Sequence, residues 1–115
     1  MTEWRRKCFP MNNRLLSLLG LARRCGRIAA GYDVAAGAVA EGISSLILVS
    51  GDIAQRTEKN ISRVAEQYQV TVIKIGETMA EIGRAIGAAP TGVISINEAG
   101  FAKKARQIVR DYEEA

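Results

Sequence analysis

The order of apolar and polar residues along the chain predicts alternating helices and strands. In five segments apolar residues recur three and four positions apart, as in an amphipathic helix, and four shorter segments are nearly continuous apolar runs, as in buried strands. The expected helices begin after these residues: Asn12 or Asn13, Asp33, Asp52, Thr78, and Asn97 or Glu98. The expected strands are residues 27–30, 45–50, 70–75 and 93–96.

Capping residues support these helix boundaries. Thr78 and Glu81 have the spacing of a capping box, in which a hydroxyl and a carboxylate each bind a backbone N–H of the first turn. Asp33 is expected to cap the second helix, and Asn12 or Asn13 the first. Glycines commonly end helices, and three stand at the expected ends: Gly26, Gly42 and Gly87.

The alternation of helices and strands favours an α/β fold with helices on both sides of one sheet. The run SLILVS at residues 45–50 is apolar on both faces, which is typical of a strand covered by helices on each side. The second helix should face inward with Val34, Ala35, Ala38 and Val39, and the third with Ile61, Val64, Ala65 and Tyr68. We expect residues 11–115 to form one domain and residues 1–10 to be a flexible extension, Met11 being an alternative start.

The charge distribution favours a polyanionic partner. Residues 1–30 have a net charge of +6 and residues 31–115 a net charge of −2, within a chain of net charge +4. A basic end on a nearly neutral body is common in proteins that bind nucleic acid. The alternative is that these are ordinary solvated charges.

The residues needed for most catalytic and metal sites are missing from the sequence. There is no histidine, and Cys8 and Cys25 are too far apart for a zinc motif. No phosphate-binding or dinucleotide-binding glycine motif is present. We therefore expect no enzyme, no metal, no cofactor and no small-molecule substrate. Cys25 is expected to be a small core residue and not a nucleophile.

The segments that precede and link these elements indicate the compartment. No apolar run approaches the length of a membrane span, and the first residues lack the apolar stretch of a secretory signal. Two separated cysteines imply no disulfide framework. We expect a cytoplasmic protein without a membrane partner.

Three segments in order resemble a known family. They are LLGLARRCGRIAAG at residues 18–31, LILVSGD at 46–52, and IGRAIG followed by a strand and NEAGFAKKA within 82–105. Together they resemble the bacterial YlxQ-like proteins of the kink-turn-binding ribosomal protein superfamily, whose archaeal and eukaryotic member is usually called L-seven-A-e. The resemblance implies a three-layer α/β/α sandwich with a four-stranded mixed sheet, binding of structured RNA, and association with ribosomes.

The resemblance places the main RNA contact at the start of the second helix. The family pattern Gly-x-Asn-Glu/Gln-x-x-Lys falls on residues 31–37, from Gly31 and Tyr32 to Gly37. Asp33 replaces the amide, Val34 the Glu or Gln, and Gly37 the lysine. Asp33 can accept a hydrogen bond from a base amine or simply cap the helix. Gly37 indicates either tight packing on the sheet, which we favour, or the close approach of a partner backbone.

Other contacts implied by the resemblance lie in a loop and in nearby arginines. The loop of residues 88–92, with Ala89, Pro90 and Thr91, covers an unstacked base in relatives; the alternative is a plain connecting loop. Arg84 stands at a basic position of the family. Arg23, Arg24 and Arg27 precede Gly31 and are expected to surround it and to hold phosphates, unless they only complement the end of a helix.

Two functions from different classes follow from these observations. The first is non-enzymatic binding of structured, kink-turn-like RNA by a ribosome-associated protein. The second is a protein-interaction module that kept the fold and lost the RNA site, which the residues at 33, 34 and 37 favour.

Overall fold

The computed structural model describes residues 9–114 of the chain, and the side chains of residues 14–111. The helices within this range are α2 (Phe9–Arg24), α3 (Tyr32–Ala40), α4 (Gln55–Gln67), α5 (Met79–Ile86) and α6 (Ala99–Glu114). The strands are β1 (Ile28–Ala30), β2 (Leu46–Val49), β3 (Val72–Lys74) and β4 (Val93–Ile96). The expected alternation of helices and strands is confirmed.

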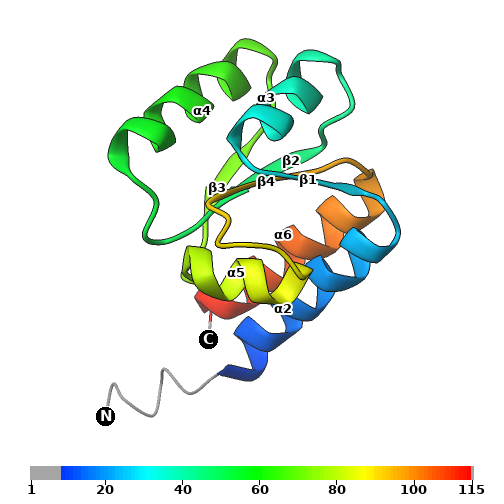
Figure 1. Ribbon diagram of the computed structural model, residues 1–115. Coiled ribbons are helices and arrows are strands. Elements are labelled where there is room, and N and C mark those ends of the chain that lie inside the picture. The colour runs from blue at the N-terminus through cyan, green and yellow to red at the C-terminus, as the bar shows by residue number, and fades with distance from the viewer. Residues whose placement is uncertain (1–8, 115) are drawn as a thin grey trace.

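The four strands form one mixed sheet in the order β1-β4-β2-β3. The strand β4 pairs antiparallel with both β1 and β2, whereas β2 and β3 are parallel. Figure 1 shows α3 and α4 on one side of this sheet and α2, α5 and α6 on the other. The predicted three-layer sandwich with a four-stranded mixed sheet is therefore confirmed.

Alternating side chains of the central strands build two separate cores. On β2, Leu46 and Leu48 pack with α2, α5 and α6. Ile47 and Val49 point the other way and pack with α3 and α4. All four are buried, as expected for a strand covered on both faces.

The helix α5 begins and ends where its local signals predicted. The backbone N–H of Glu81 donates to Thr78 Oγ1 at 3.2 Å, and the N–H of Thr78 donates to Glu81 Oε1 at 2.9 Å. The predicted capping box is therefore present. Gly87 ends the helix with a φ of 71°, a left-handed conformation that glycine adopts without steric cost.

Several predicted details of the helices were wrong. The first helix begins at Phe9, before the expected asparagine caps, because Pro10 is tolerated in a first turn. Val34 is 60% exposed, since Ala35, Ala38 and Val39 form a stripe too narrow to include it. Tyr68 is 45% exposed because it ends α4, where the chain turns.

Two further expectations concern the ends of the chain and its one described cysteine. The expected flexible extension lies largely in residues 1–8, which are outside the described residues. Cys25 is a free, exposed thiol in the turn after α2, so its expected place in the core was wrong. Within the described part of the chain, no helix has both the length and the apolar character needed to cross a membrane.

Two helical glycines meet opposite surroundings. A Cβ added at Gly83 in α5 would collide with the carbonyl oxygen of Ala89 and lie 2.9 Å from that of Ala88. A Cβ added at Gly37 in α3 would meet nothing within 4 Å. The tight packing expected at Gly37 was therefore wrong, and it is Gly83 that lets the chain after α5 fold back against the helix.

These two glycines should respond oppositely to alanine. Gly83→Ala is expected to lower the free energy of unfolding by about 1–3 kcal/mol, the usual cost of overpacking. Gly37→Ala should raise it by up to about 1 kcal/mol, because alanine has the higher helix propensity. Urea unfolding followed by circular dichroism measures both. A destabilised Gly37→Ala variant would contradict the open surroundings of Gly37.

Candidate nucleic-acid interface

The start of α3 presents backbone groups without a capping side chain. Gly31 is the N-cap residue, with φ 102° and ψ 153°, and no side chain binds the first turn. A side chain would be strained at this positive φ, so the conformation requires glycine. The N–H groups of the first helical turn lack partners within a helix, and they attract anions and hydrogen-bond acceptors.

The loop between α5 and β4 lies beside this helix start. The N–H of Gly31 donates to the carbonyl oxygen of Val93 at 2.9 Å, and Val93 directly follows the loop of residues 88–92. Figure 1 shows the end of β1 and the start of β4 side by side at this edge of the sheet. The structure thus brings together the two segments that the sequence indicated. We call them, residues 31–34 and 88–92, the tip surface.

Residues of the loop divide into exposed and buried ones. Ala88, Ala89 and Pro90 are exposed. Thr91 is buried, its N–H donates to the Met79 carbonyl at 3.0 Å, and its hydroxyl donates to the Ala89 carbonyl at 2.8 Å. Thr91 therefore shapes the loop, and the surface expected from it is supplied by Ala88, Ala89 and Pro90.

The first residues of α3 also divide in this way. Tyr32 is half-buried and packs on the core beneath α3 and α4. Asp33 and Val34 are exposed. Asp33 was expected to cap α3, which was wrong, because Gly31 occupies the cap position and Asp33 lies in the first helical turn. There its negative charge faces the positive end of the helix dipole, which is favourable.

The arginines do not surround the tip surface as expected. Arg27 precedes β1, and its carbonyl oxygen accepts a hydrogen bond from the N–H of Asn97 at 2.8 Å. It therefore lies at the end of β1 opposite Gly31, roughly 10 Å away along an extended strand of three residues. Arg23, Arg24 and Arg84 lie in the layer of α2 and α5, across the sheet from α3.

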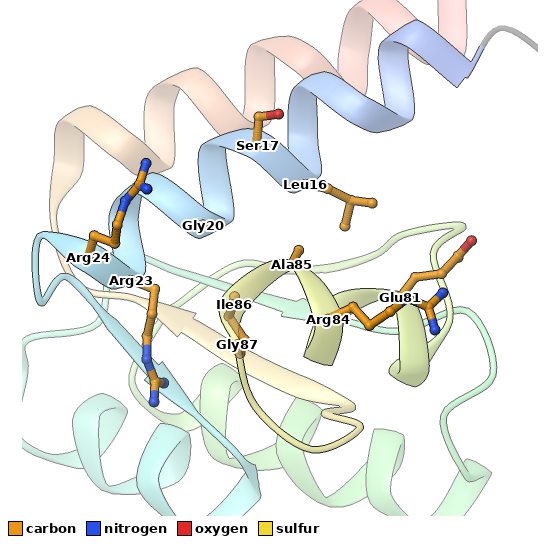
Figure 2. A pocket seen from close by; sticks show the side chains of 10 residues that line it. All are labelled: Leu16, Ser17, Gly20, Arg23, Arg24, Glu81, Arg84, Ala85, Ile86 and Gly87. Atoms are coloured by element: carbon orange, nitrogen blue, oxygen red, sulfur yellow. The ribbon is translucent and has the colours of Figure 1, made fainter.

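These three arginines line a groove between α2 and α5. Its other lining residues are Leu16, Ser17, Gly20, Glu81, Ala85, Ile86 and Gly87, and its volume is about 760 Å³. In Figure 2, Arg23 and Arg24 stand at the end of α2, and Arg84 extends from α5 beside Glu81. The sequence did not indicate this groove, although Gly20 inside a helix marks a possible close contact. A Cβ at Gly20 would lie 2.9 Å from the Ala85 carbonyl oxygen.

Comparison with known proteins identifies the family. Residues 13–106 match the model of the "Ribosomal protein L7Ae/L30e/S12e/Gadd45 family". This chain belongs to that family. A Bacillus subtilis (strain 168) member named RNA-binding protein YlxQ is 31% identical over 87 residues, which are 76% of this chain and 86% of that protein. The Enterococcus faecium RNA-binding protein YlxQ is 27% identical over 96 residues, which are 84% of this chain and 91% of that protein.

Solved structures show the same fold. A protein of unknown function from Bacillus halodurans C superposes with a TM-score of 0.78 and 33% identity, over 84% of this chain and 96% of that one. The Giardia lamblia 15.5kD RNA binding protein superposes with a TM-score of 0.70 and 24% identity, over 91% of this chain and 89% of that one. At this identity, the second likeness supports the fold alone. The family match includes the tip surface and the groove.

A buried carboxyl lies close to the base of the loop. Glu77 is 4% exposed, and its Oε2 atom has no hydrogen-bond partner among the described residues. Burial raises the pKa of the Glu77 carboxyl above its usual 4.5, and repulsion from Glu81 adds to the rise. By contrast, the N–H of Met79 donates to the exposed Asp52 at 3.0 Å and lowers the pKa of that carboxyl. The neutral form of Glu77 is thus the one that the fold favours.

Removing the charge of Glu77 should stabilise the protein only above acidic pH. Because its pKa is raised in the folded state, stability from this group is full below about pH 4.5 and is lost as the pH rises through the folded pKa. Glu77→Gln should therefore be more stable than the wild type at pH 7, with the difference shrinking toward pH 4. Urea unfolding at both pH values measures it, with the exposed Glu66→Gln as control. A difference that grew on acidification would contradict the raised pKa.

Proposed function

We propose that this chain binds structured RNA through the tip surface, and that the RNA contains a kink turn. The observation that carries the proposal is the hydrogen bond between Gly31 and Val93, which holds the uncapped start of α3 beside the exposed loop. Family membership supports it, as does the name RNA-binding protein given to two relatives. Association with the ribosome belongs to the same proposal, since the family is described as one of ribosomal proteins.

The chemistry of the tip surface suits base edges and a splayed base. Uncapped N–H groups at the start of α3 offer hydrogen bonds to phosphate or base acceptors. The exposed Asp33 carboxylate can accept a hydrogen bond from a base amine. Ala88, Ala89 and Pro90 offer a shallow apolar surface against which an unstacked base can lie. These contacts are those of recognition, and we propose no catalytic step.

Retention of a short kink-turn RNA in a native gel tests the proposal. A matched duplex of the same length without the bulge is the control RNA, and both are titrated across a salt series. We expect preferential binding of the kink-turn RNA, with affinity falling as salt rises because phosphate contacts release counterions. Absence of binding at low salt, or equal binding of the two RNAs, would refute the proposal.

A lysine restored at position 37 should strengthen this binding. Gly37 lies in α3 with open space around it, so Gly37→Lys fits without collision and adds a positive charge near the tip surface. We expect about tenfold tighter binding of the kink-turn RNA, equivalent to one charge-assisted hydrogen bond.

Two variants control for other effects of that substitution. Gly37→Ala reports the gain in helix propensity alone. Ala40→Lys adds the same charge at an exposed position at the far end of α3. If Gly37→Lys binds no more tightly than either control, the RNA contacts lie elsewhere.

A specific observation favours the second candidate function. Val34 is apolar and 60% exposed, and it lies in the tip surface together with Ala88, Ala89 and Pro90. An apolar patch of this kind suits a protein partner as well as a base. Purification from cells with and without ribonuclease distinguishes the two candidates, because only a protein partner bound directly survives the nuclease.

A further inference from the structure

The groove between α2 and α5 has an excess of positive charge. Arg23, Arg24 and Arg84 line it together with a single acid, Glu81, so the lining carries a net charge of +2. The Glu81 carboxylate accepts the N–H of Thr78 in the capping box. All three arginines are exposed. The groove therefore offers several guanidinium groups to an anion.

These guanidinium groups are not neutralised by carboxylates of the described chain. Among residues 14–111, the ion pairs within 4.0 Å are Arg14–Asp111 and Lys74–Glu58, and neither involves the groove. An arginine without a carboxylate partner can bind a phosphate through two parallel hydrogen bonds. Three such arginines along one groove suit an extended chain of phosphates better than a single anion.

The base of the groove is formed by small and apolar residues. Gly20 brings α2 against the carbonyl of Ala85, so no side chain separates the two helices at their contact. Leu16 and Ile86 line the groove beside them. In Figure 2 the two arginines of α2 and the arginine of α5 stand on either side of this contact. The arrangement is a narrow channel with charged rims.

The groove is continuous with the tip surface. Gly87 lines the groove and is also the residue from which the loop of residues 88–92 departs. The N–H of Ala88 donates to the Gly83 carbonyl at 2.8 Å, which holds the start of the loop against α5. A ligand that crosses the loop from the tip surface therefore meets the groove next.

We propose that this groove is a second RNA-binding surface, which holds the sugar-phosphate backbone of the helical stem that continues beyond the kink. The choice of RNA as the occupant rests on the proposed function, since the groove extends the same interface. Charge complementarity supports it independently. The groove reads no sequence, because phosphate contacts position a nucleic acid without specifying it.

The test compares two triple variants that remove the same charge from opposite layers of the sandwich. The groove variant is Arg23→Gln, Arg24→Gln and Arg84→Gln. The control variant is Arg56→Gln, Lys59→Gln and Arg63→Gln, three exposed residues of α4. The probes are a minimal kink-turn RNA, the same RNA with its stem lengthened by one helical turn, and a plain RNA duplex.

We expect the groove variant to lose about tenfold in affinity for the lengthened RNA and about 2–3 from the slope of its salt dependence, close to one per phosphate contact. Its affinity for the minimal RNA should change less than about twofold, and the control variant should lose little on either probe. Equal losses on the minimal and lengthened RNAs, or equal losses in both variants, would overturn the groove proposal.

Failure of the proposed function is distinguishable from failure of the groove. If the wild type does not prefer the kink-turn RNA, the tip proposal fails, and the plain duplex then decides the groove. Selective loss of duplex binding by the groove variant would support it, and absence of duplex binding or equal loss would overturn it. Unchanged RNA binding, with loss of partners that survive nuclease, would assign the groove to an acidic protein and overturn the proposal.

The free thiol of Cys25 allows a direct measurement of position. It is exposed in the turn after Arg24, so Cys8→Ser leaves one thiol at the end of the groove, to which iron-EDTA can be attached. Hydroxyl radicals from this site should cut the lengthened stem. The matched control carries Cys8→Ser, Cys25→Ser and Ser62→Cys on α4, and should leave the stem intact. Cutting of the stem only from position 62 would overturn the proposal.

Discussion

The antiparallel pairing of β1 with β4 is the interaction on which the candidate site depends. Its register places Ala30 opposite Ile94, and the ladder ends with the N–H of Gly31 bound to the carbonyl of Val93. Because of this one bond, the start of α3 and the loop before β4 share an edge although they are about sixty residues apart in the chain. Neither segment has a rigid core of its own, so the sheet supplies the rigidity that recognition requires.

Local signals predicted the elements well wherever the cause of the structure was itself local. The capping box of Thr78 and Glu81, the glycine after α5 and the apolar run at β4 each depend on a few neighbouring residues. Predictions were wrong where the outcome depended on the breadth of a buried face. Val34 and Tyr68 are apolar residues beside a buried stripe, and only the packing of the neighbouring layer decides that they remain exposed.

The candidate site was predictable in part for the same reason. The resemblance indicated the helix start at Gly31 and the loop of residues 88–92, and the structure places them together. The positions of the arginines were not predictable, because four to eight residues of separation do not reveal that a turn at Gly26 and a strand intervene. The groove depends on a contact between Gly20 and Ala85, which no local pattern encodes.

The absent side chain of Gly83 has a consequence for how this surface can diverge. Because the carbonyls of Ala88 and Ala89 rest directly on α5, the course of the loop is determined by main chain against main chain. The outward side chains at 88–90 take no part in that contact and are exposed. Relatives can thus exchange these residues, and with them their preferred targets, while the scaffold beneath retains one shape.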